Sequence, residues 1–431
     1  MITQSKGKYL LLGLLLVVSF RLSFLYGQIS INSPYTRYGL GTLVENGNDP
    51  RITAMGGLYS GFRSPSVINT ANPASYTAFD SVSFVFDAGV FGLMSNLQVT
   101  NQKNQGSYVS LSHLLFGFPV TRWWRTSFGV LPFSFVGYDI FNTEQQTGMP
   151  DIQYVYRGSG GLNQLYWGNG FKIGKKLSVG FNVKYLFGNI TRSRGVSFPD
   201  SIEVKNTYIR SSMRPSDFYG EIGLQYREKL SEDLFMVVGG VFGPELEIGS
   251  STSRLVTTYF GDITEAQLYY DTIDAVDNEK GSFTLPMRTG GGVTVGKDGK
   301  WMAGADFMWQ NWEKYRNNGN SDSLVNRWSV GVGGEYIPDS RNIGTYFQRV
   351  AYRIGFQYGR TPIYLKGKYI DEFGISFGMG LPIKKSKSTV NLAATIGKRG
   401  TIQNGLIQEN FVKFTIAVNV FENWFFKSKY Y

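Results

Sequence analysis

The stretch that decides the fold is Leu177-Ser178-Val179-Gly180-Phe181-Asn182-Val183-Lys184-Tyr185, in which apolar and polar or small residues alternate without exception. Alternation with a period of two is typical of a β-strand whose two faces meet different surroundings. The same pattern recurs along the chain, with clear examples at Trp328–Tyr336, Tyr352–Tyr358, Phe373–Leu381 and Val412–Val420. Altogether about fourteen such segments are found, which predicts an all-β protein.

The connections between these segments alternate in length. Short basic turns include Gly174–Lys176, Lys229–Asp233, Lys297–Lys300 and Lys384–Ser388. Longer polar stretches lie between them, at roughly Met94–Gly106, Gly137–Ile152, Gly188–Pro215, Gly249–Lys280, Glu313–Val325, Gly359–Tyr369 and Lys398–Glu409. A closed up-and-down barrel in an outer membrane has this asymmetry, because its periplasmic turns are tight and its outer loops are long.

A soluble β-sandwich would also show alternating strands. However, the apolar faces here extend over about 9–11 residues, the length that a tilted strand needs to cross a bilayer. The polar faces are rich in glycine and carry only occasional charges, which predicts a lumen packed against other protein; these charged residues are Asp87, Lys184, Glu221, Asp306, Glu335 and Arg353. We therefore expect a transmembrane antiparallel β-barrel of about 14 strands over residues 81–431, with a short C-terminal tail.

The N-terminal part of the chain does not follow the strand pattern. Residues 1–27 have a basic start with Lys6 and Lys8 and a short apolar stretch, as in a signal peptide for export. Residues 28–80 are rich in turn-forming residues and aromatics and low in charge. This composition favours a compact N-terminal plug inside the barrel over a disordered tail. The expected location is the outer membrane of a Gram-negative cell.

Composition limits the chemistry. The chain has no cysteine, so disulfides and thiolate metal ligands are excluded. The single histidine, His113, cannot form a histidine-based metal site, and we predict no metal, no cofactor and no enzyme activity. The glycines Gly290–Gly292 lack a phosphate-binding context and are expected to pack against the plug. The formal charge of +11 comes without a nucleic-acid motif, which favours outer-membrane lipid or lipopolysaccharide as the anionic partner.

Several short motifs give the chain a resemblance to a known family. They are Ala54-Met55-Gly56-Gly57, Asn72-Pro73-Ala74, Gly158–Leu162 and Lys176–Gly188. In these motifs the chain resembles the FadL family of outer-membrane transporters for hydrophobic compounds, and its Bacteroidetes relatives that include PorV-like proteins. The resemblance implies a fourteen-stranded barrel with a plug, in which Asn72, Pro73 and Ala74 lie beside an inward kink of the third strand that opens the wall laterally.

The third strand of the predicted barrel is Arg125–Tyr138, and it contains Gly129 and Pro132. A proline cannot donate a hydrogen bond to the sheet, so Pro132 indicates a break in the wall. The alternative is a proline tolerated at a bulge near the rim.

Two functions are compatible with these features. The first is passive uptake of a hydrophobic small molecule through the lateral opening, as the resemblance implies. The second is a non-transporting barrel subunit of an outer-membrane protein assembly or secretion complex, with envelope proteins as partners. The polar long loops favour the second, because a hydrophobic ligand needs an apolar collecting groove. The resemblance and Pro132 favour the first, which is the function that we predict. Within them, Val196–Val204 is expected to form a hairpin and Glu265–Val276 a short helix.

Overall fold

The computed structural model describes residues 33–44, 49–100, 102–145, 150–198, 204–260, 270–339, 345–384 and 386–423. The predicted signal peptide and C-terminal tail lie outside these residues. The elements are almost all strands, in the order η1 (Pro34–Arg37), β1 (Thr42–Leu43), α2 (Pro50–Ala54), η3 (Pro73–Ala78), β2 (Ser83–Val99), β3 (Gln102–Pro119), β4 (Trp124–Glu144), β5 (Ile152–Ile173), β6 (Leu177–Ser197), β7 (Asn206–Lys229), β8 (Leu234–Gly243), β9 (Leu246–Tyr259), β10 (Tyr270–Leu285), β11 (Arg288–Lys297), β12 (Trp301–Gln310), η4 (Trp312–Lys314), β13 (Arg316–Asn317), β14 (Asn320–Ser321), β15 (Arg327–Tyr336), η5 (Tyr346–Arg349), β16 (Ala351–Leu365), β17 (Lys368–Pro382), β18 (Thr389–Gly400), η6 (Gln403–Gly405) and β19 (Gln408–Asn423). None of the helices in this part of the chain has the length and apolar character needed to cross a membrane.

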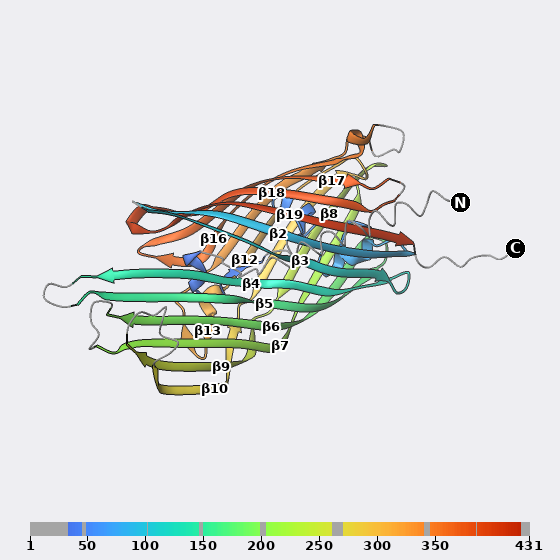
Figure 1. The fold of residues 1–431 in the computed structure, drawn as a ribbon. Coiled ribbons are helices and arrows are strands. Elements are labelled where there is room, and N and C mark those ends of the chain that lie inside the picture. Colours follow the sequence, from blue (N-terminus) through green and yellow to red (C-terminus); the bar gives the residue numbers. More distant parts are fainter. Residues whose placement is uncertain are drawn as a thin grey trace, which may run out of the picture.

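The long strands form a closed antiparallel β-barrel (Figure 1). Each strand pairs with the next, and β19 pairs with β2 from Gln408↔Gln98 to Asn423↔Ser83, which closes the ring. The pairs β8/β9 and β10/β11 are each one wall strand, interrupted at Pro244 and Pro286, so the barrel has 14 strands. The predicted fold class is confirmed.

The four short turns quoted above lie between strands as predicted, whereas the expected long loops are mostly strand. For example, β6 continues to Ser197 and β7 begins at Asn206, within the expected loop 188–215. The short helix expected at Glu265–Val276 is wrong for Tyr270–Val276, which is strand in β10 and pairs with β9; residues 265–269 lie outside the described part. Pairing with a neighbouring strand satisfies the backbone of these polar segments, which composition alone does not reveal.

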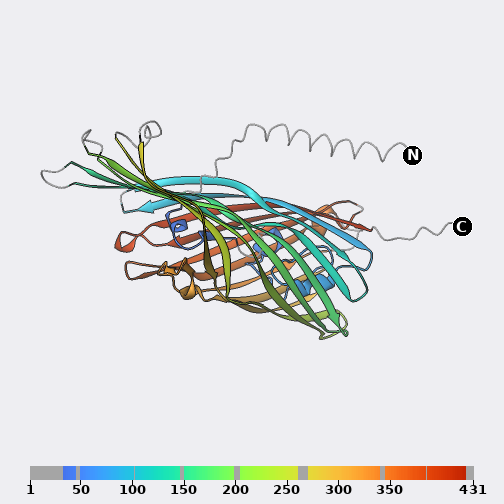
Figure 2. The same cartoon turned by 90° about the horizontal axis from the view of Figure 1, so that it is seen from below.

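One side of the wall is much taller than the other. Strands β4 to β7 have 21 to 24 residues, whereas β12 and β15 have 10. The pairing of the tall strands is interrupted at Pro132 in β4, at Gly188 in β6, and at the two prolines between β8 and β9 and between β10 and β11. Figure 2 shows the result, in which β4–β7, β9 and β10 extend beyond the rest of the barrel.

Residues 33–44 and 49–80 lie inside the barrel, where most of their side chains are buried (Figure 1). The inward faces of the wall accommodate them with small residues and hydrogen-bonding groups. Gly56, at a positive φ of 71°, passes so close to Gly331 and Gly355 that a Cβ at either position would lie within 2.1 Å of its backbone. A Cβ at Gly290 would lie 2.4 Å from the hydroxyl of Tyr59, whereas the nearest atoms to Gly291 and Gly292 belong to the wall residues Gly239 and Asp306. Of the three glycines expected to pack against the plug, only Gly290 therefore contacts this segment. We refer to residues 33–44 and 49–80 together as the interior segment.

Two adjacent glycines of β8 test how closely this segment is packed. A Cβ at Gly239 would lie 1.8 Å from the backbone oxygen of Ser60, whereas a Cβ at Gly240 would have no heavy atom nearer than 3.7 Å. We expect Gly239→Ala to lower the free energy of unfolding by about 1–3 kcal/mol, since overpacking shifts the backbone, and Gly240→Ala to have little effect. Urea unfolding in lipid vesicles, followed by tryptophan fluorescence, measures both. Equal stability of the two variants would contradict the close packing.

Candidate functional site

The wall of the barrel forks between β3 and β4. These strands pair over only six residues each, from Pro119↔Arg125 to Leu114↔Val130. Beyond Leu114, β3 continues back to Gln102 and β4 continues to Glu144, but the two no longer pair. In Figure 1 they run side by side on the right and separate toward the left. We call this place the fork.

The sequence of β4 explains why the pairing ends here. Gly129 permits the last close approach, since a Cβ at this position would lie 2.2 Å from the backbone oxygen of Leu114. Pro132 follows and has no N–H to continue the ladder. Phe133 is then an extra residue in the pairing with β5, which jumps from Pro132↔Asn163 to Ser134↔Leu162. The break predicted from Gly129 and Pro132 therefore coincides with the fork.

The free edge of β4 is covered by the start of the interior segment. β1 pairs with β4 through Thr42↔Phe135 and Leu43↔Ser134. The backbone N–H groups of Val44 and Ser33 donate to the carbonyl oxygens of Phe133 and Gly137, at 2.9 and 3.0 Å respectively. Gly41, at a φ of 87°, makes this approach possible, because a Cβ there would lie 2.2 Å from the carbonyl oxygen of Phe135.

The opposite edge of the fork is different. No strand in the described part of the chain pairs with the β4-facing edge of β3 over Gln102–Leu111. On the outer face of this stretch, Val109 and Leu111 are 66% and 46% exposed. Exposed apolar side chains on a barrel wall face lipid. The open edge of β3 therefore extends into the apolar layer.

Three aromatic rings lie on the inner side of the fork. Phe91, Tyr108 and Phe135 come from β2, β3 and β4, and their ring centroids are 5.5 to 5.7 Å apart. Phe91 and Phe135 are buried. They border a cavity of about 190 Å³ between the interior segment and the wall, which is also lined by Trp312, Trp328 and other aromatic and basic residues. The rings fill the space between this cavity and the fork.

The lone histidine lies directly at the fork. His113 is fully buried, and its Nε2 is 3.0 Å from Oδ1 of Asp87 on β2. Its Nδ1 is 2.9 Å from the hydroxyl of Ser112, which is an extra residue in the pairing of β3 with β2. Asp49 of the interior segment lies beside them, and burial, together with Asp87, raises the pKa of its carboxyl. The residues that line the 190 Å³ cavity do not include Ser112, His113 or the two aspartates.

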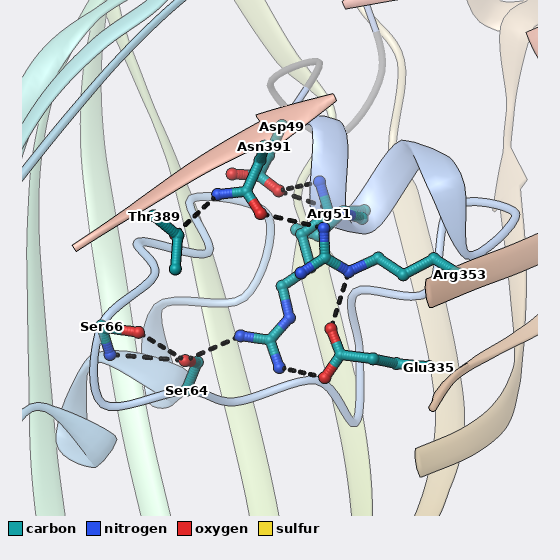
Figure 3. A network of polar contacts seen from close by, with 9 residues as sticks. Asp49, Arg51, Ser64, Ser66, Glu335, Arg353, Thr389 and Asn391 are labelled. Atoms are coloured by element: carbon teal, nitrogen blue, oxygen red, sulfur yellow. Dashed lines mark hydrogen bonds and ion pairs between the residues drawn. The ribbon is translucent and has the colours of Figure 1, made fainter. Parts of the chain in front are cut away.

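A second buried polar cluster holds the interior segment against β15, β16 and β18 (Figure 3). Glu335 of β15 accepts hydrogen bonds from Arg51 of the interior segment and from Arg353 of β16, each at 2.7 Å. Arg353 also donates to Asn391 of β18 at 2.9 Å, and Arg51 donates to Ser64 at 3.1 Å. All six charged residues that the sequence places in the lumen are buried in contacts of this kind, with Lys184 bound to Glu221 and Asp306 bound to backbone N–H groups.

The predicted plug motif lies elsewhere. Asn72 caps η3 and donates to the carbonyl oxygens of Ser60 and of Leu224 on β7. Pro73 packs against glycines of β5, β6 and β7. The motif thus contacts a different part of the wall from the free edge at the fork, which residues 33–44 cover instead. A role of Asn72, Pro73 and Ala74 at an opening stays a prediction.

Comparison with known proteins gives a family and a fold. The family described as BamG matches residues 8–431. No curated protein sequence matches. Similar solved structures include the Ralstonia pickettii toluene transporter TbuX, with a TM-score of 0.56 and 14% sequence identity over 87% of this chain and 98% of that one. A Pseudomonas aeruginosa FadL homologue has a TM-score of 0.55 and 12% identity over 90% of this chain and 100% of that one. The Pseudomonas putida toluene transporter TodX is a third, with a TM-score of 0.53 and 15% identity over 89% of this chain and 99% of that one. At these identities the likeness shows a common barrel fold.

The buried cluster around Glu335 predicts a large effect of a single change. Glu335→Ala leaves Arg353 buried without its counter-charge, and we expect a loss of about 3–5 kcal/mol in the free energy of unfolding. Asp274→Ala breaks the exposed ion pair with Arg254 and should cost at most about 1 kcal/mol. The double variant Glu335→Ala/Arg353→Met should recover part of the loss. Similar stabilities of the two single variants in urea titrations would contradict this account.

Proposed function

The chain belongs to the BamG family, and from this premise we propose that it is a non-transporting barrel subunit of a protein assembly in the outer membrane of a Gram-negative cell. In this proposal the chain binds a partner protein along the open edge of β3 and along the tall wall formed by β4–β7, β9 and β10. The interior segment serves as a plug that keeps the barrel rigid and closed.

The open edge of β3 is the observation that carries the proposal. In the hydrocarbon layer no water is available for unpaired N–H and C=O groups, and each unsatisfied group costs several kcal/mol. The edge of β3 that faces the fork has backbone N–H and C=O groups without a partner strand. The outer side chains of this stretch, Val109 and Leu111, are apolar and exposed. An extended segment of a partner would pair with this edge through main-chain hydrogen bonds, as in other cases of strand addition.

The tall wall supports the same function. A strand needs about 9–11 residues to cross the apolar layer, and β5 has 22. Half of this side therefore rises beyond the membrane as paired sheet. Its surface carries basic and acidic side chains that form exposed ion pairs, such as Arg157–Asp139, Lys205–Asp271 and Arg254–Asp274. A firm, mixed-charge surface suits contact with a protein better than collection of an apolar molecule.

The interior of the barrel gives further support. The interior segment is joined to the wall by buried ion pairs and by close backbone contacts with glycines. At the fork, β1 covers the edge of β4, and the rings of Phe91, Tyr108 and Phe135 fill the space behind it. A hydrophobic molecule would have to displace these rings to reach the membrane from the cavity.

A second candidate function is lateral uptake of a hydrophobic compound. The aromatic lining of the 190 Å³ cavity beside the fork favours it, and several proteins of the same fold are toluene transporters. The two functions differ in what occupies the fork, which is a partner strand in the first and a small molecule in the second.

Site-specific crosslinking tests the docking function. A photoreactive residue replaces Val109 at the open edge in living cells, and the matched control replaces Ile354 on the fully paired β16. Both positions face outward and are similarly exposed, at 66% and 58%. We expect a discrete protein adduct from position 109 and none from position 354, because Val109 lies on the open edge of β3, whereas Ile354 pairs with a strand on each side. Adducts with lipid alone at both positions would contradict the docking function.

A vesicle assay tests the second candidate. We expect vesicles containing the protein to take up the hydrophobic dye N-phenylnaphthylamine no faster than empty vesicles, and Phe135→Ala to leave the rate unchanged. Phe84→Ala, which alters an aromatic residue of the wall away from the aromatic trio, is the control. Faster uptake by the protein that rises further in Phe135→Ala, but not in Phe84→Ala, would favour transport over docking.

A further inference from the structure

Three potential metal ligands from distant parts of the sequence meet at the fork. They are Asp49, which precedes α2 in the interior segment, Asp87 of β2 and His113 of β3. One ligand atom of each lies within 4.8 Å of the others, and all three residues are buried. Zn²⁺ binds carboxylate oxygen and imidazole nitrogen at about 2.0–2.2 Å, so the ligand atoms of a tetrahedral site lie about 3.3–3.6 Å from one another. His113 Nε2 and Asp87 Oδ1, now 3.0 Å apart, would separate slightly, and any ligand atoms farther apart than this would move closer.

The hydrogen bonds around His113 orient it as a ligand. With Nδ1–H donating to the hydroxyl of Ser112 at 2.9 Å, the lone pair of Nε2 faces Asp87 Oδ1 at 3.0 Å. A metal-bound imidazole usually has its other nitrogen fixed by such a partner. Oδ1 of Asp49 already accepts the backbone N–H groups of Arg51 and Ile52, at 2.8 and 3.0 Å. Two carboxylates and an imidazole lone pair in one buried place require a positive charge between them.

Asn419 of β19 provides an independent indication of a ligand. Its side chain is fully buried, and its amide lies against the cluster, with Nδ2 donating to Oδ2 of Asp87 at 3.2 Å. The amide oxygen, Oδ1, has no hydrogen-bond partner. A buried acceptor without a partner costs about 1–3 kcal/mol. Rotation of the amide by half a turn would point Oδ1 toward Asp87, where a cation would satisfy it.

We propose that Asp49, Asp87, His113 and Asn419 form a binding site for one divalent transition-metal ion, with Zn²⁺ the best match. Two carboxylates, one imidazole and one amide oxygen supply four ligands, and the imidazole favours a transition metal over Mg²⁺ or Ca²⁺. A site of this kind contributes to folding, and four protein ligands leave no open position for chemistry. The ion holds the interior segment, β2, β3 and β19 together.

The position of the site gives it a structural role. His113 immediately precedes Leu114, where the pairing between β3 and β4 begins. The metal therefore fixes the inner end of the open edge and joins it to the interior segment. This inference does not depend on the proposed function, because a docking barrel and a transporter would both need the fork to be held at this point.

The test uses the full mature chain, without a histidine tag, refolded from urea into detergent in ZnCl₂ or in EDTA. Refolding is required because the site is buried. After dialysis, elemental analysis should find about one Zn²⁺ per chain in the first sample, as for a single site. The zinc-loaded protein should melt at a higher temperature than the EDTA sample. Refolding in CoCl₂ should give the visible absorption bands of a four-coordinate cobalt site.

The variants Asp87→Asn and His113→Gln should lower the bound zinc at least about tenfold, since each removes a ligand. Asp306→Asn is the matched control, because Asp306 is also a buried carboxylate of the lumen but binds backbone N–H groups of Tyr59 and Ser60 instead. It should keep its zinc. If the ligand variants do not fold, the zinc content and melting temperature of the wild-type protein refolded in ZnCl₂ or in EDTA still show whether the site binds metal.

Less than about 0.1 Zn²⁺, Mn²⁺ or Co²⁺ per refolded chain, with the same melting temperature in ZnCl₂ and EDTA, would overturn the proposal. In that case protons shared between the carboxylates and the imidazole would supply the positive charge. Equal loss of zinc in Asp306→Asn and Asp87→Asn would also overturn it, since the metal would then not be bound at the fork.

Discussion

The requirement that every backbone N–H and C=O group in a bilayer be paired within protein governs this structure. The ring of strands meets it around almost the whole wall, and β19 closes on β2 over sixteen residue pairs from Ser83 to Gln98. At the fork the requirement is met on one side only. Residues of the interior segment pair with β4, whereas the edge of β3 has no partner strand among the described residues. The proposed function follows from this difference, because an edge left open in lipid is a place for another chain to bind.

The interior segment and the wall depend on each other. Glycines of β8, β15 and β16 let the segment approach the wall backbone closely, and buried charged groups then hold it at chosen points. Such ion pairs lose much of their attraction to desolvation, so their main effect is to fix one arrangement, since breaking either partner leaves a buried charge. The proposed metal ion would act in the same way at the fork, where it joins the segment to three strands of the wall. Both clusters lie around α2, with Asp49 at one and Arg51 at the other.

Much of the fold could be predicted from the sequence, because strand alternation and short basic turns are local signals. The inward position of residues such as Glu335 and Arg353 followed from the same alternation. Pro132 located the break, since the absence of an N–H is a property of one residue. The strands beyond the membrane were expected as loops, because polar composition does not reveal whether a segment pairs with its neighbour. The cluster of Asp49, Asp87 and His113 could not be foreseen, as its members are brought together only by barrel closure and by the path of the interior segment. The part of that segment that covers β4 has no periodic pattern and gave no signal.

Electron cryo-microscopy of the protein, purified from its native membrane in a mild detergent, tests the central claim most directly. The decisive region is the edge of β3 from Gln102 to Leu111. Our account predicts polypeptide density of a different protein along this edge, with a filled interior behind it. A solitary barrel with lipid chains or a small hydrophobic molecule at the fork, and with no protein along β3, would contradict it.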